Sequence, residues 1–432
     1  MEAIRKEILP GVWLTALESD KFKTGCLSIS LLTQLDRETA AQNALIPYVL
    51  RRGSRYHTDM QALAAELDGL YGSYIEPVVR KIGEIQCVGF LASFADDKYL
   101  PDGSGVFESI ANLCGEILLT PFTKGGLLLP GYVESEKEKL LDSIRGRLND
   151  KRSWALQRLI EQMCCYEAFA VSRLGTEDTA ENIYYQKLTK HYRNLLMTSP
   201  VEIFYCGSLG ADFVAEKLSD ALSGMPRGEI DYDIGTDIRM NSVEDQPREF
   251  SDELSVTQGK LVMGYRLGDC MDDPDIAAMY VFNAVFGGCV TSKLFMNVRE
   301  RLSLCYYASS LVDLHKGLMI VSSGVDFDKF DAAKAEIEAQ LETVRRGEVD
   351  ADELLAAKKS VASDLRATLD SQYNLEGFYL ANTIDGLDFD PEELAAAVEC
   401  VELDAVVDIA RSVVPDAVYY LRGNGEEDGD EA

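Results

Sequence analysis

The chain has 432 residues, of which 47% are apolar, and its formal net charge is −31. A chain of this length and apolar content can bury more than one hydrophobic core, which excludes a disordered protein. Nucleic-acid-binding proteins present a basic face, so this acidic chain is expected to have no nucleic-acid partner. No apolar run approaches the roughly 18 residues that cross a bilayer, and the N-terminus lacks a signal-peptide pattern. We therefore expect a cytoplasmic protein without membrane association.

The first predicted elements are a strand over 26–32 and an apolar helix that ends at Gly53. The segment that forms this helix reads Ala44-Leu45-Ile46-Pro47-Tyr48-Val49-Leu50-Arg51-Arg52-Gly53-Ser54. A proline inside a helix removes a backbone donor and costs about 3 kcal/mol. The sequence therefore predicts that this helix begins near 45–47 or is kinked there.

The rest of the first half mixes strands and helices without strict alternation. Thr58 and Gln61 form a capping-box pattern that predicts a helix start, and a strand over 85–94 follows. A further helix is predicted over 133–148, with apolar residues at helical spacing. A β-rich run after Pro200 closes this half.

The second half repeats the outline of the first. The segment 279–287 is an apolar helix closed by glycine, as 45–53 is, and the two lie 234 residues apart. A strand-like segment precedes each helix, and a β-rich run after a proline ends each half. These repeats predict an α+β fold with two homologous halves, each an antiparallel sheet with helices packed mainly on one face.

The domain boundaries follow from composition. We predict an N-terminal domain over 1–222, a polar linker over 223–247 and a C-terminal domain over 248–425. The last segment, 426–432, is predicted to be an acidic tail.

Three blocks of the sequence resemble the insulinase, pitrilysin and mitochondrial processing peptidase family, and the likeness covers nearly the whole chain. The segment 44–54 stands where the family has H-x-x-E-H-M-L-F-K-G-T, and 134–144 resembles its E-x-x-x-x-x-x-E helix. The segment 286–306 parallels G-G-x-x-S-R-L-F-x-x-I-R-E-x-x-G-L-A-Y. The chain is most similar to a bacterial branch that lacks the zinc site and is associated in some genomes with elongation factor P modification.

The resemblance implies that the zinc site of active members is degenerate here. Such a site needs two histidines one helical turn apart, a glutamate base between them and a third ligand. Ala44 and Tyr48 stand at the histidine positions, Pro47 stands at the base, and the helix register places Ser143 at the third ligand. Because these residues provide no ligand set, we expect no metal, no cofactor and no peptidase activity from this chain alone.

Arg299 and Tyr306, by contrast, are retained in the third block. In active family members an Arg and a Tyr at this spacing lie in the half or subunit without zinc and donate to the substrate carbonyl or the developing oxyanion. The resemblance therefore implies a catalytic role in trans for both residues. A structural interpretation stays open, in which Arg299 pairs with a neighbouring acid and Tyr306 opens a strand with its ring in the core.

Two functions follow from this pattern. The favoured hypothesis is a non-catalytic subunit of a two-chain zinc peptidase, in which a homologous H-x-x-E-H partner supplies the zinc and this chain completes the peptide chamber. The alternative is a peptide-binding or structural scaffold protein with no hydrolytic role. An independent cysteine enzyme is disfavoured, because no patterned histidine accompanies any cysteine. The chain in isolation is free to form a homodimer.

Overall fold

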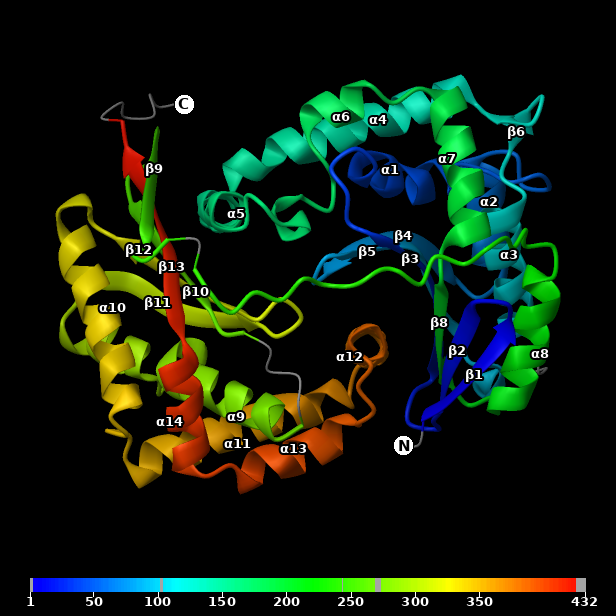
Figure 1. The fold of residues 1–432 in the computed structure, drawn as a ribbon. Helices are drawn as coiled ribbons and strands as arrows, with labels where there is room; N and C mark the ends of the chain where they lie inside the picture. Colours follow the sequence, from blue (N-terminus) through cyan, green and yellow to red (C-terminus); the bar gives the residue numbers. More distant parts are fainter. Residues whose placement is uncertain (1–2, 102–103, 243, 269–272, 425–432) are drawn as a thin grey trace. The chain divides into compact units, whose positions relative to one another are not determined.

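The computed structural model describes residues 3–101, 104–242, 244–268 and 273–424 (Figure 1). The predicted acidic tail at 426–432 lies outside the described residues. The chain forms two compact units. The first combines the chain up to Arg145 with Val171–Gly235 and Ser371–Gly386, and the second combines Gly146–Ala170 with Thr236–Asp370 and the chain from Leu387 onward.

This division differs from contiguous domains over 1–222 and 248–425, because each unit includes one helix from the other half of the sequence. Helix α5 (Lys151–Met163) belongs to the second unit, and helix α12 (Gln372–Asp385) belongs to the first. The cause is tertiary packing, since the apolar stripe of α5 is buried against the second sheet. The chain passes from the first unit to the second between Gly235 and Thr236, which lie inside the predicted linker over 223–247.

The sheet of the first unit has the strand order β1-β2-β8-β3-β5-β4. Only the pairing of β2 with β8 is parallel among these neighbours. Every residue of β8 is buried, in keeping with its mostly apolar sequence and its central position in the sheet. The edge strand β1, by contrast, contains three charged residues. The strands are β1 (Ala3–Leu9), β2 (Val12–Glu18), β3 (Thr24–Gln34), β4 (Tyr74–Ile82), β5 (Ile85–Ala95) and β8 (Val201–Gly207).

Apart from α12, which packs on β3 and β8, the helices of the first unit bury their apolar residues in one core with this sheet. Helix α2 begins after Asp59, whose carboxylate accepts a hydrogen bond from the backbone N–H of Ala62. The predicted cap at Thr58 is therefore wrong by one residue. The helices are α1 (Ala40–Leu50), α2 (Met60–Gly69), α3 (Val106–Leu119), α4 (Pro130–Arg145), α6 (Glu177–Glu181), α7 (Tyr185–Thr198) and α8 (Ala211–Leu222).

The sheet of the second unit repeats the same topology. Its order, β9-β13-β10-β12-β11, corresponds strand by strand to β2-β8-β3-β5-β4, and its single parallel pair, β9 with β13, corresponds to β2 with β8. The predicted α+β class with two homologous halves is confirmed. The strands are β9 (Arg248–Leu254), β10 (Gly259–Arg266), β11 (Cys305–Asp313), β12 (Leu318–Val325) and β13 (Val414–Gly423).

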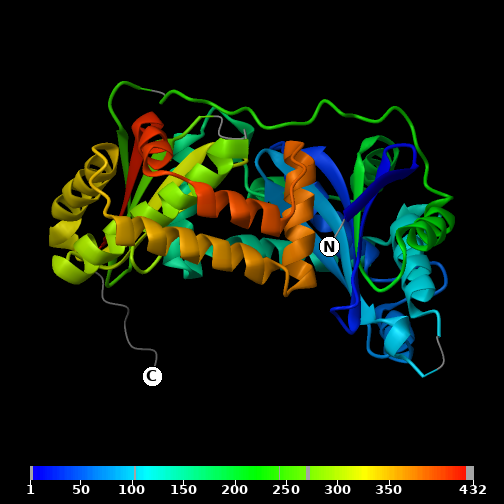
Figure 2. The ribbon, with the colours of Figure 1, turned by 90° about the horizontal axis from the view of Figure 1, so that it is seen from below.

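The helices of the second unit gather on one side of its sheet, where α10 packs against α14 and α11 against α13 (Figure 2). Helix α5 alone among the described helices of this unit packs on the opposite face. None of the helices in the described part of the chain has the length and apolar content that a bilayer crossing requires. The helices are α9 (Asp273–Asn283), α10 (Phe330–Arg345), α11 (Ala351–Thr368), α13 (Pro391–Cys400) and α14 (Leu403–Ser412).

A buried ionic cluster fixes the segment that follows α5 to the second sheet. Glu167 accepts from Arg266 Nη2 at 2.7 Å and from Lys316 Nζ at 2.6 Å, and Asp416 accepts from Arg266 Nε at 2.8 Å. Arg248 also pairs with Asp416, at 3.0 Å. The Arg266, Lys316 and Asp416 side chains are completely buried, so each charge depends on its partners for stabilisation.

Candidate functional site

Helix α1 carries the degenerate metal motif, and it begins earlier than the sequence predicts. It runs from Ala40 to Leu50 with Pro47 in its interior, so the prediction of a start near 45–47 is wrong. The proline removes only one intrahelical hydrogen bond. Ten of the eleven residues of α1 are buried, and their packing offsets that loss.

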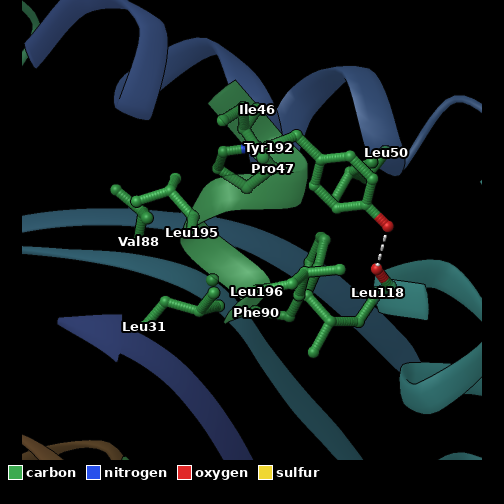
Figure 3. A pocket seen from close by; sticks show the side chains of 11 residues that line it. Leu31, Ile46, Pro47, Leu50, Val88, Phe90, Leu118, Tyr192, Leu195 and Leu196 are labelled. Carbon is green, nitrogen blue, oxygen red and sulfur yellow. Dashed lines mark hydrogen bonds between the residues drawn. The ribbon is translucent and has the colours of Figure 1, made fainter. Parts of the chain in front are cut away.

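Pro47 stands at the position of the catalytic base and is turned into the apolar core (Figure 3). It lines a small pocket together with apolar side chains from β3, β5 and α7. Tyr192 on α7 closes one side, and its hydroxyl donates to the carbonyl of Leu118 at 2.6 Å. An apolar ring in an apolar pocket offers no group that could activate water.

The two positions of the absent histidines lie in different environments. Ala44 is fully buried in the core of the first unit, whereas Tyr48 is 42% exposed. The neighbouring Asn43 anchors this turn of the helix, since its amide donates to Gln86 Oε1 at 2.8 Å and its oxygen lies 2.5 Å from His191 Nε2. Burial, and then the charge of Lys187, lowers the pKa of His191, so this imidazole is a neutral structural group.

The third-ligand position, Ser143, lies exposed on α4, and its hydroxyl donates to the carbonyl of Lys139 at 2.8 Å. Two turns of α4 earlier, Glu136 is buried and accepts from Arg52 Nη1 at 3.0 Å. This ion pair links the turn after α1 to α4. Glu136, the glutamate that is retained from the E-x-x-x-x-x-x-E pattern, therefore stabilises the packing of α4 here.

No group of three or more His, Cys, Asp and Glu side chains that could hold a metal ion occurs among the described residues. The residues at 44, 47, 48 and 143 include one hydroxyl and one phenol as their only polar groups. Neutral oxygens of this kind are poor zinc ligands compared with imidazole, thiolate or carboxylate. These four side chains therefore provide no ordinary zinc ligand set.

The retained arginine lies in an irregular helix of the second unit. Residues Leu294–Arg301 form a π-helix, in which Leu302 N–H donates to the carbonyl of Asn297 five residues back, at 3.1 Å. Arg299 is partly exposed, and its Cζ lies 4.6 Å from the centre of the Phe295 ring. A π-helix of eight residues is rare, and π segments occur frequently at functional sites.

The retained tyrosine lies on a β-bulge. The register between β11 and β12 shifts between Cys305 and Tyr307, so Tyr306 is the extra residue of the bulged strand. Bulges redirect side chains, and the Tyr306 side chain is 59% exposed. The Tyr306 ring therefore does not lie in the core, as the structural interpretation required. The other part of that interpretation holds, since Arg299 Nη1 lies 3.6 Å from Oε1 of the neighbouring Glu300.

The phenol of Tyr306 donates to Asp326 Oδ1 at 3.1 Å, and Lys329 pairs with the same carboxylate at 2.9 Å. This hydrogen bond, together with the negative charge of Asp326, raises the pKa of Tyr306. The phenol is therefore protonated at neutral pH and able to donate a hydrogen bond. Arg299 and Tyr306, both among the described residues, form no hydrogen bond with each other, and their positions are set separately by the π-helix and the bulge.

The sequence contains little that predicts this irregular backbone. Its one signal is Ser303, which occupies the glycine position of the R-E-x-x-G-L-A-Y pattern and adopts a positive φ of 50°. A non-glycine residue in this region costs about 1–2 kcal/mol. The π-helix, the strained Ser303 and the bulge all fall between 294 and 307.

Replacing Ser303 with glycine is expected to raise the free energy of unfolding by about 0.5–1 kcal/mol. Glycine relieves the strain at positive φ but adds freedom to the unfolded chain, which limits the gain. Denaturant unfolding of the variant would measure it. The matched control is Ser309→Gly on β11, where φ is not positive and the same change should destabilise. Equal destabilisation by both changes would contradict the assigned strain.

Comparisons with known proteins show which family and which relatives this chain resembles. Residues 182–361 match the family described as the Peptidase M16 inactive domain. Over 415 residues the chain is 29% identical to the probable inactive metalloprotease YmfF of Bacillus subtilis, and the alignment covers 96% of each chain. The predicted family resemblance is confirmed, whereas the association with elongation factor P modification stays a prediction.

Solved structures show the same fold. A conserved protein from Enterococcus faecalis V583 superposes with a TM-score of 0.88 at 26% identity, over 99% of this chain and 100% of that one. The peptidase M16 inactive domain from Pseudomonas fluorescens superposes with a TM-score of 0.79 at 15% identity, over 99% and 100%. The second likeness establishes the fold alone.

Proposed function

We propose that this chain, which resembles the inactive M16 peptidases, is the non-catalytic subunit of a two-chain zinc peptidase. A homologous partner with an intact H-x-x-E-H motif supplies the zinc and the base. This chain completes the peptide chamber, and Arg299 and Tyr306 act on the carbonyl that the partner's zinc polarises. Arginine and phenol donors aimed at a developing oxyanion stabilise the transition state more than the bound substrate.

The observation that carries the proposal is the contrast between the two motif regions. Two of the four positions of the degenerate zinc site, Ala44 and Pro47, are packed in the core. The Arg299 and Tyr306 region instead keeps a π-helix, a strained Ser303 and a bulge. Irregular backbone of this kind lowers stability and persists mainly where function requires it.

The proposal is tested by mixing the purified chain with an H-x-x-E-H homologue from the same genome, beginning with one encoded next to it. Cleavage of a quenched fluorescent peptide library is followed for each chain alone and for the mixture. The expected result is activity that depends on both chains and follows a 1:1 complex in size-exclusion chromatography. Full activity of the homologue alone would leave this chain as a peptide-binding or structural scaffold.

The purified chain alone is expected to contain far less than one zinc ion per molecule, and the complex to contain one. The reason is that the positions 44, 47, 48 and 143 provide no imidazole, thiolate or carboxylate. Elemental analysis after dialysis would measure both ratios. One tightly bound zinc per isolated chain, lost on replacing Tyr48 with Ala, would contradict this prediction.

A further inference from the structure

Two cations lie over one aromatic ring on the face of the second sheet that α5 covers. Arg152 lies in the first turn of α5, and Lys260 lies on β10. The Cζ of Arg152 is 4.4 Å and the Nζ of Lys260 is 6.0 Å from the centre of the Tyr307 ring. The ring faces of aromatic side chains attract cations, but two like charges this close also repel each other.

Neither cation forms an ion pair with any acid in the described part of the chain. Arg152 Nη2 donates to Ser309 Oγ at 3.2 Å, and Lys260 Nζ donates to Gln258 Oε1 at 2.5 Å. Both partners are neutral. The chain as a whole has 73 acidic residues, so two neighbouring cations without an acidic ion-pair partner contrast with its overall charge.

Asp150 is the acid whose charge acts on Lys260, and it already serves as the N-cap of α5. Its carboxylate accepts from the backbone N–H groups of Arg152 and Ser153 at 3.0 and 3.2 Å and from the Ser153 hydroxyl at 2.5 Å. Burial, and then the charge of Arg152, lowers the pKa of Lys260, and Asp150 opposes this only weakly. Two cations beside one carboxylate that already caps α5 leave net positive charge, which an incoming anion would neutralise.

Gly324 leaves space for the Tyr307 ring, which the two cations contact. Lys260, Gly324 and Tyr307 stand opposite one another on β10, β12 and β11. A Cβ atom at Gly324 would lie 2.6 Å from the Tyr307 ring, so a larger residue would displace that ring. The next pair on the same face adds hydroxyls, with Ser322 Oγ 3.5 Å from the Tyr307 hydroxyl and Ser309 opposite Ser322.

We propose that Arg152, Lys260 and Tyr307 form an oxyanion-binding site that takes the C-terminal carboxylate of a peptide. The guanidinium presents paired donors that match the two carboxylate oxygens, and the ammonium adds a second positive charge. The choice of a peptide ligand rests on the proposed function, but binding needs no partner chain. Inorganic phosphate shares the same chemistry, and the experiment separates the two.

The test measures binding to the purified full-length chain by isothermal titration calorimetry. The probes are acetyl-tetraalanine with a free carboxylate, the same peptide as its amide, and inorganic phosphate. The free acid is expected to bind at least 10-fold more tightly than the amide and more tightly than phosphate, and to weaken as salt screens the site. Arg152→Gln and Lys260→Gln should each lower its affinity by about 10-fold or more, as the loss of a charge-assisted hydrogen bond does.

Lys151→Gln is the matched control, because it removes the same charge from the adjacent position of α5. It should bind the free acid like the unmodified chain, and thermal unfolding should be similar for all three variants. Equal binding of acid and amide, tighter binding of phosphate, or an equal loss in the Lys151 variant would overturn the proposal. None of these outcomes tests whether this chain activates an H-x-x-E-H partner. The carboxylate site and the two-chain peptidase can therefore be refuted independently of each other.

Discussion

Replacing Arg299 with alanine is expected to lower kcat of the reconstituted two-chain peptidase by about 100-fold, with complex formation unchanged. The guanidinium is partly exposed and contacts mainly Phe295 and Glu300 within its own helix, so its removal should not unfold the second unit. If it stabilises the oxyanion, kcat and kcat/KM fall together while KM changes little. Tyr306→Phe, which removes only the donor, should give a loss of similar size. Steady-state cleavage by the pair measures both.

Arg301→Ala is the control for this experiment. Arg301 lies in the same π-helix, is exposed, and carries the same charge. Its removal should leave kcat within a factor of about two if the effect at 299 comes from a specific donor and not from net charge, because surface charges are screened. Equal losses at 299 and 301, or unchanged activity in the Arg299 and Tyr306 variants, would refute a catalytic role in trans.

Replacing Glu167 with glutamine is expected to lower the free energy of unfolding by about 3–5 kcal/mol. The change removes the carboxylate that pairs with both Arg266 and Lys316, which are fully buried. Asp416 still pairs with Arg266, but the cluster has one negative charge fewer. Removing one partner of a buried ion pair costs more than the pair contributes, since the remaining charge stays out of water. Denaturant unfolding would measure the loss. Glu161→Gln on α5 serves as control, because Glu161 pairs with Arg158 at the surface and should cost about 1 kcal/mol or less.

The same cluster predicts a loss of stability in acid. Burial alone would raise the pKa of Glu167, but hydrogen bonds from Arg266 and Lys316 and their charges outweigh it and hold this pKa below its ordinary value. A depressed carboxyl pKa contributes stability that is complete above the unfolded value, about 4.3, and is lost as pH falls further. The stability difference between the unmodified chain and Glu167→Gln should therefore shrink below about pH 4.3. A constant difference down to pH 3 would contradict the assignment.

The sequence by itself determined the repeated halves, the α+β class and the degenerate metal motif. Apolar periodicity and prolines mark the strands that became β3, β8, β10 and β13, and these signals depend only on nearby residues. The replacement of histidine and glutamate at 44, 47 and 48 is a matter of residue identity and needs no structure. The retained Arg299 and Tyr306 were found in the same way.

Only the tertiary structure decided how distant segments share a core. The exchange of α5 and α12 between units, and the contact of Glu167 with Arg266 across 99 residues, leave no local pattern in the chain. Arg152 and Ser309, 157 residues apart, meet for the same reason. Pro47 lies inside a helix because burial of the surrounding turns outweighs one missing hydrogen bond. The π-helix and the bulge likewise depend on the packing of the second unit, which overrides the local preference for regular backbone.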